Sequence, residues 1–315
     1  MKTDWINLRN QLISSTPWTN VYGIGRSLLA LGTFLTLAFN DIHILFKPTL
    51  ISHQVPNVIG IGRFGLFNLM ADYLLLAQIL SVVILLLVII GWRPRVTAVL
   101  HWYVTASFAA GAATIDGGDH VSTVLTLLIL PVALTDPRRW HWSTLDPTQA
   151  KSPYACILAG SDLFVIRIQV AIIYLHAAVG KWSVPEWADG TSLFYWFTDP
   201  SFGLASHIKP LIFWLLLYPT SVTLLTWGII VLEFVLFLGL SADRRFRGYL
   251  LVIGIFFHLM IGVVHGLISF ALAMTAALIL YLRPFDQRFK FKLSLPKFAF
   301  RQYIHKGKPV LRSVK

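Results

Sequence analysis

The chain has little charge and almost no cysteine for its length. Of its 315 residues only 13% are charged, and Asp and Glu number 14 against 26 Lys and Arg. A single cysteine, Cys156, excludes an internal disulfide and any metal site built only from cysteines. There is also no His-Glu-x-x-His motif, and no serine or cysteine arrangement supports a protease. Neither disulfide-based stability nor one of the common protease mechanisms is therefore expected.

Hydrophobic residues are abundant instead, at 56% of the chain with a mean hydropathy of +0.70. A soluble core of this size cannot bury so much apolar sequence. Hydropathy predicts eight spans, each near the ~20 residues that a bilayer core requires. The predicted spans are residues 21–39, 73–91, 96–114, 121–134, 162–180, 221–240, 248–264 and 267–282. The expected fold class is an all-α, polytopic membrane helical bundle of about eight transmembrane helices.

The distribution of basic residues predicts the orientation of this bundle. Cytoplasmic loops carry an excess of Lys and Arg. With the N-terminus inside, 20 of the 26 basic residues fall in inner segments and 4 in outer ones. Both termini are therefore expected in the cytoplasm. The net charge of +12 is explained by topology, and no nucleic-acid partner is expected.

Composition also divides the chain and marks two unusual segments on the predicted outer side. Residues 1–284 form the expected membrane domain, and residues 285–315 form a basic, aromatic cytoplasmic tail that would either anchor to anionic membrane lipid or dock a partner. The outer loop over residues 181–210 contains several Trp and Tyr residues, typical of a segment at the headgroup level. Residues 211–218 are apolar but too short to span, which indicates a re-entrant or interfacial piece.

The fifth span carries the first candidate site. On a helix of 3.6 residues per turn, Arg167, Tyr174 and Lys181 fall on one alanine-lined face. Ionisable groups at membrane depth usually face the bundle interior or a cavity. Lys181 is either an anchor whose ammonium reaches the headgroups, or an enclosed lysine that acts as a base.

A second candidate lies in the turn before the fourth span, where Asp119 and His120 follow two glycines. These residues either cap the helix or face the same outer cavity as Lys181, as a proton acceptor or substrate contact. The pattern is too weak to predict a metal site, and no metal is expected.

Arg26, Glu233 and His258 are expected inside spans, where an unpaired charge is costly. We expect Arg26 or Arg167 to pair with Glu233. His258 is either a neutral core histidine or a titrating one near the outer cavity.

Six motifs give the chain a resemblance to a known family. They are Tyr22-Gly-Ile-Gly-Arg26, Gly91-Trp-Arg-Pro-Arg95, His101-Trp-Tyr103, Thr114-Ile-Asp-Gly-Gly-Asp119, Glu186-Trp-Ala-Asp-Gly190 and Phe257-His-Leu259. In this order they resemble the bacterial sporulation-delaying protein B family, a branch of the horizontally transferred transmembrane (HTTM) domain group. That group also includes the membrane part of vitamin K-dependent gamma-carboxylase, to which the likeness is looser.

The bacterial family implies a multi-pass protein of the bacterial inner membrane that works with a partner protein to mature a secreted antimicrobial peptide toxin. The carboxylase resemblance implies an outward-facing site in which a lysine deprotonates a reduced quinone, the role that Lys181 would carry. Tyr174, Arg167 and Trp187 would then contact the quinone. The carboxylase has two adjacent lysines where this chain has Gly180 and Lys181, and Glu carboxylation is not assumed.

Three hypotheses about function follow. In the leading one, the precursor of the peptide toxin is held or processed at an outer cavity lined by Lys181, Tyr174, Asp119 and His258. The first alternative is a quinone-dependent enzyme with Lys181 as base. The second is a non-catalytic peptide-binding scaffold or immunity-type protein.

Overall fold

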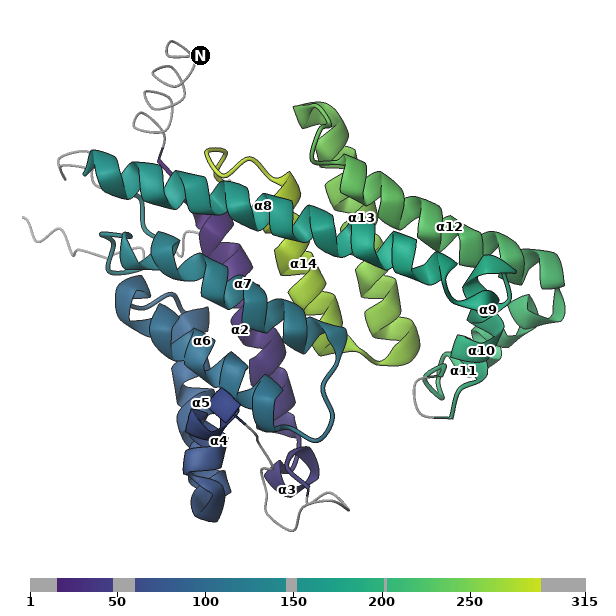
Figure 1. Ribbon diagram of the computed structural model, residues 1–315, viewed down its shortest axis with the longest axis horizontal. Coiled ribbons are helices and arrows are strands. Elements are labelled where there is room, and N and C mark those ends of the chain that lie inside the picture. Colours follow the sequence, from purple (N-terminus) through teal and green to yellow (C-terminus); the bar gives the residue numbers. More distant parts are fainter. Residues whose placement is uncertain (1–15, 48–59, 146–151, 201–202, 290–315) are drawn as a thin grey trace, which may run out of the picture.

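The computed structural model describes residues 16–47, 60–145, 152–200 and 203–289, and within these ranges it contains helices but no strands. Eight of the described helices have at least fifteen residues (Figure 1). They are α2 (Asn20–Phe39), α5 (Leu74–Ile89), α6 (Pro94–Gly111), α7 (Gly117–Leu134), α8 (Pro153–Trp182), α12 (Pro219–Leu238), α13 (Arg244–His265) and α14 (Ile268–Leu282). The all-α prediction is confirmed for this part of the chain.

Six of these helices are long and apolar enough to cross a membrane: α2, α5 (with the preceding residues 71–73), α7, α8, α12 and α13. The chain is therefore a multi-pass membrane protein. α6 contains polar residues such as Arg95 and His101, and α14 has only 15 residues. The predicted total of eight spans, and the side on which each terminus lies, stay predictions.

The bundle is built around α14, which packs against α2, α7, α8 and α13. Every residue from Ala273 to Leu282 is buried, as expected for a helix that is apolar all round and covered by neighbours. Gly25 permits the close contact with α2, because a Cβ there would lie 2.7 Å from Leu280 Cγ. A second apolar core joins α5 and α6 to α2 and contains the stacked rings of Phe46 and Phe67.

Three helix starts lie four or more residues before the predicted spans, those of α7, α8 and α13, the last beginning at Arg244 instead of residue 248. α8 begins at Pro153, nine residues before the predicted start, because proline suits the first turn of a helix and this early part packs against α7. α7 begins at Gly117, so Asp119 lies in the first helical turn. The two glycines there do not adopt positive φ. Gly118 is instead required by space, because a Cβ would meet the Phe270 backbone at 2.7 Å.

Short helices cover the predicted outer side. Between α2 and α5 lie α3 (Ile42–Leu45), η1 (Gly60–Phe64), α4 (Leu66–Leu69) and η2 (Ala71–Tyr73). Between α8 and α12 lie α9 (Pro185–Ala188), α10 (Ser192–Thr198), α11 (Lys209–Ile212) and η3 (Phe213–Leu217), which form a lobe at the right of Figure 1. The lobe is fixed to α13 by a hydrogen bond from Ala205 N to Val264 O, 2.8 Å long.

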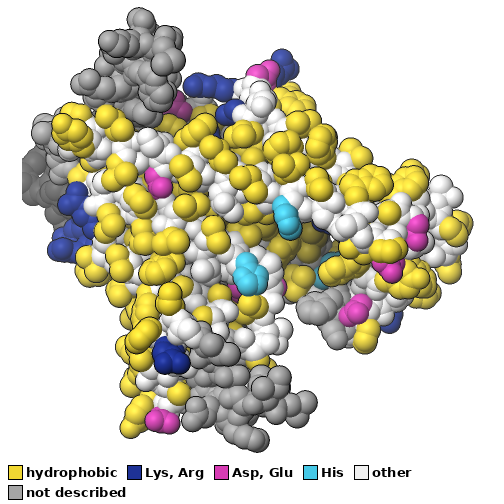
Figure 2. Space-filling model, in the orientation of Figure 1, with side chains coloured by type: hydrophobic (Ala, Val, Ile, Leu, Met, Phe, Trp, Pro, Cys, Tyr) yellow, Lys and Arg dark blue, Asp and Glu magenta, His cyan; other side chains and the backbone are white. Residues whose placement is uncertain are grey.

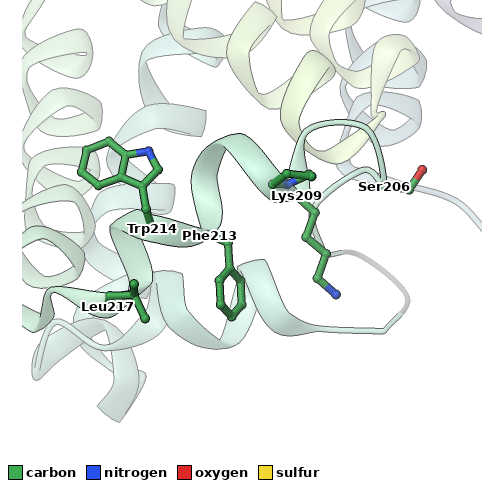
Figure 3. A pocket seen from close by; sticks show the side chains of 6 residues that line it. Ser206, Lys209, Phe213, Trp214 and Leu217 are labelled. Carbon is green, nitrogen blue, oxygen red and sulfur yellow. The ribbon is translucent and has the colours of Figure 1, made fainter.

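Figure 2 shows a largely hydrophobic surface on the lobe with acidic side chains among the hydrophobic ones, and exposed aromatic rings such as Tyr195 and Trp214 contribute to it. An open groove lies on α11 and η3, lined by Ser206, Lys209, Pro210, Phe213, Trp214 and Leu217 (Figure 3). Trp214 and Leu217 are more than half exposed. These features fit the predicted interfacial segment at residues 211–218. Of the predicted tail, residues 290–315 lie outside the described residues.

Candidate functional site

Lys181 forms an ion pair with Glu233 near the end of α8. Its Nζ lies 2.8 Å from Oε1 and 2.7 Å from Oε2 of Glu233, and the side chains are only 21% and 10% exposed. Glu233 comes from α12, which packs closely on α8. Lys181 is therefore partly buried against α12 and paired with a carboxylate. The alternative of an anchor that extends freely toward the headgroups does not describe this arrangement.

The Trp187 ring also contacts the Lys181 ammonium, in addition to Glu233. The Lys181 Nζ lies 5.1 Å from the centre of the Trp187 ring, a cation–π contact. Trp187 belongs to α9, which follows α8 after a turn at Ser183, and the lobe is fastened to α12 by a hydrogen bond from Trp227 Nε1 to Ala188 O. The lobe therefore contacts the ion pair directly through Trp187 and is attached to the helix that carries Glu233.

Tyr174 and His258 form the second polar pair. The Tyr174 hydroxyl lies 2.9 Å from His258 Nε2, and both side chains are buried. Tyr174 lies two helical turns before Lys181 on the same face of α8. The two pairs interact electrostatically, Lys181 with His258 and Glu233 with Tyr174.

His258 also has a buried ring nitrogen, Nδ1, without a hydrogen-bond partner among the described residues. Its ring lies between Phe257 and Phe270, with centroid distances of 4.9 and 5.6 Å. A buried polar atom without a partner is costly. This atom is therefore where a bound molecule would gain a hydrogen bond.

Asp119 and His120 are not joined to these pairs by any contact within the described ranges. Asp119 completes a capping box: its Oδ2 accepts from Asp116 N at 3.0 Å, while Asp116 Oδ1 accepts from Asp119 N at 3.0 Å. His120 is exposed. The capping alternative therefore describes Asp119, and a substrate role for either residue stays a prediction.

Arg167 lies apart from the Lys181 pair, although both are on α8. It is 14 residues earlier, about 21 Å along the helix axis. Its Nη2 donates to Arg283 O at 3.1 Å, and its guanidinium lies 5.7 Å from the Phe285 ring. Because 14 residues complete almost four turns, the two residues share a face but sit at different depths.

The expected pairing of Glu233 with Arg26 or Arg167 is wrong, because Lys181 satisfies the carboxylate. Arg26 is fully buried on α2 and contributes to another network. Its Nη2 donates to Thr97 Oγ1 at 2.5 Å, and its Nη1 lies 3.4 Å from His141 Nδ1.

Sequence reasoning missed the partners of Arg26 in this network, and also an ion pair next to it. Arg138 and Asp136 form a buried ion pair 2.7 Å long, and Arg138 Nη1 also donates to the carbonyl of His141 at 2.8 Å. Asp136 Oδ1 accepts from Arg138 N, which is the two-residue turn that Asp side chains favour. The Asp-Pro-Arg order after α7 was the available signal.

The fold and the two polar pairs define a class: a polytopic α-helical membrane protein with ionisable groups held between its helices. The chain is 37% identical over 298 residues to sporulation-delaying protein SdpB of Bacillus subtilis (strain 168), covering 93% of this chain and 90% of that protein. It is also 41% identical over 276 residues to the uncharacterized protein YitO of the same strain, covering 87% and 89%.

The chain therefore belongs to the family of sporulation-delaying protein SdpB. The family predicted from the motifs is confirmed to this extent. No protein-family model and no solved structure matches the chain. The wider resemblance to the HTTM group and to gamma-carboxylase stays a prediction.

Proposed function

We propose that this membrane protein acts in the production of a secreted peptide toxin, at the polar site formed by Lys181, Glu233, Tyr174 and His258. The name of the relative SdpB supports a role in a sporulation-delaying pathway. The Lys181–Glu233 ion pair is the observation that supports the location of the site. A peptide precursor and a partner maturation protein are the expected binding partners.

The ion pair suggests how the site acts. A base must first lose its proton, and loss of the Lys181 proton would leave the buried carboxylate of Glu233 without its counter-charge. The arrangement therefore favours binding over proton abstraction by Lys181. A peptide offers carbonyl oxygens to the ammonium and to an Nδ1–H of His258, which has no partner among the described residues.

The quinone-dependent alternative is less favoured than peptide binding. It would require Glu233 to move away from Lys181 before the lysine could act on a reduced quinone. No distance or contact in the described part of the chain favours that step, so we do not propose it.

The proposal is tested in a host strain that lacks the gene, complemented with the wild type or with variants. Secreted mature peptide is measured by mass spectrometry, and membrane protein by immunoblot. We expect Lys181→Ala to remove mature peptide at an unchanged protein level. Lys209→Ala makes the same chemical change in the nearby lobe outside the polar pairs, and it should leave secretion unchanged.

Two outcomes would change the interpretation. Full secretion from Lys181→Ala would remove this site from the function. Full secretion from Lys181→Arg together with loss in Lys181→Ala would indicate that only the charge pair is needed, as in a non-catalytic scaffold.

A further inference from the structure

Four arginines lie at the end of the bundle where α12 and α14 finish. This arginine cluster consists of Arg167 on α8, Arg244 and Arg247 on α13, and Arg283 directly after α14. Arg167 Nη2 donates to the Arg283 carbonyl at 3.1 Å, and Arg167 interacts electrostatically with Arg244 and Arg247. Figure 2 shows basic side chains at the upper edge of the molecule, over the connection between α12 and α13.

The cluster carries more positive charge than its neighbours neutralise. Asp286 interacts with Arg167, and Asp243 caps α13 by accepting from Phe246 N at 2.7 Å. Two aspartates thus lie at the same end of the bundle as the four arginines. Like charges held together in a partly buried position repel one another, so an anion placed among them would stabilise the protein.

Several guanidinium N–H groups of the cluster already donate hydrogen bonds, and these bonds fix the positions of the side chains. Arg247 Nε and Nη2 donate to the carbonyls of Gly239 and Leu240 at 3.1 and 2.8 Å, at the end of α12. The side chains of Arg167 and Arg247 are therefore held in place by backbone carbonyls.

Arg283 supplies the donor without a partner. Its Nε is buried and makes no hydrogen bond to any described residue. Its guanidinium lies 4.5 Å from the Phe289 ring, which keeps the plane fixed. A planar guanidinium whose Nε–H has no partner can donate to the oxygens of a phosphate.

We propose that the arginine cluster binds a phosphate group, carried either by the headgroup of an anionic phospholipid or by a free phosphate ion. Exposed apolar side chains lie close by in sequence, Phe164 at 56% and Phe246 at 46%, where acyl chains would contact the helices. The site differs from the Lys181 site and does not depend on the proposed function.

The test uses the purified full chain in neutral detergent. The midpoint of thermal unfolding is recorded against increasing phosphatidylglycerol, phosphatidylcholine or inorganic phosphate. Arg283→Gln is the main variant, because the hydrogen bond from Arg167 goes to the backbone of residue 283 and survives the change. Arg139→Gln is the matched control, an exposed arginine on the same predicted side.

We expect phosphatidylglycerol to raise the midpoint in the wild type and phosphatidylcholine not to. Arg283→Gln should raise the half-saturating concentration about tenfold or more, because one charge-assisted hydrogen bond is lost. Arg139→Gln should leave it unchanged. An equal effect of inorganic phosphate would support the site and identify free phosphate as its ligand.

No midpoint shift with either phosphate compound would overturn the proposal. So would an equal weakening in Arg139→Gln, which would show diffuse attraction to the whole basic surface. If Arg283→Gln does not fold, Arg283→Lys keeps the charge but loses the planar donors, and wild-type affinity in that variant would also overturn the site.

Discussion

A lysine ammonium that donates to both oxygens of one carboxylate leaves each partner dependent on the other. In Lys181→Met the Glu233 carboxylate loses its counter-charge, and in Glu233→Leu the ammonium loses its acceptor. We expect each single change to lower the free energy of unfolding by about 3 kcal/mol. The double variant should cost less than the sum, as denaturant unfolding in detergent would measure.

Lys209→Met is the control for this pair and should be close to neutral. If the single effects of Lys181→Met and Glu233→Leu simply add, the two side chains are not coupled, and the ion pair does not contribute to stability in solution.

His141 gives a prediction about pH at a single residue. Arginine has only donors, so the contact with Arg26 requires an unprotonated Nδ1, and Nε2–H then points to Ser27 Oγ at 3.3 Å. Burial, with Arg26 and Arg138 nearby, lowers the pKa of His141 from its ordinary 6.5 to about 2. The folded protein therefore keeps His141 neutral.

Between these two pKa values the unfolded state binds a proton that the folded state does not. His141 thus contributes stability above pH 6.5, and this contribution decreases as the pH falls. At pH 5 the loss is about 2 kcal/mol. The midpoint of thermal unfolding should drop between pH 7.5 and 5, less so in His141→Gln, while His176→Gln, at an exposed position, keeps the wild-type slope. Identical slopes in all three proteins would contradict this.

At the scale of helices, substitutions in the first turn of α7 distinguish a capping role of Asp119 from a catalytic one. Asp119→Ala removes the acceptor for Asp116 N and should lower the free energy of unfolding by about 1 kcal/mol. Because Asp119 has no contact with the Lys181 or His258 side chains in the described structure, secretion should remain. His120→Ala, at an exposed position, should change neither.

The two readouts are the denaturant midpoint and the amount of secreted peptide. Loss of secretion from a stably folded Asp119→Ala protein would show that Asp119 belongs to the functional site. A stability loss without loss of secretion would assign it to the cap alone.

Helix positions were largely predictable, and contacts between helices were not. An apolar run of suitable length marks a helix in lipid whatever its neighbours, so all eight predicted spans overlap a long helix. The face shared by Tyr174 and Lys181 also follows from helix periodicity. Which helix supplies Glu233 or His258 depends on packing over 52 and 84 residues of separation, and one sequence contains no direct signal for that.

Across the whole molecule, side-chain hydrogen bonds join helix ends that are predicted to lie on the same side of the membrane. Asp116 before α7 accepts from Ser269 in α14 at 3.3 Å, and both are predicted to lie outside. At the other end, Trp18 Nε1 donates to Val132 O at 3.0 Å, and Asn20 Nδ2 to Phe289 O at 2.8 Å. The contacts thus join ends that the charge bias places on the same side.

The absolute orientation of the bundle in the membrane is simple to test, because Cys156 is the single cysteine of the chain. In a Cys156→Ala background, cysteines are introduced at exposed positions: Thr114→Cys and Ser183→Cys for the predicted outside, Arg139→Cys and Ser241→Cys for the inside. A membrane-impermeant maleimide should label the first two in intact right-side-out spheroplasts, and the others only after permeabilisation. Because Ser183 lies two residues from Lys181, the reverse result would place the Lys181 site in the cytoplasm, where it could not meet a secreted peptide after export.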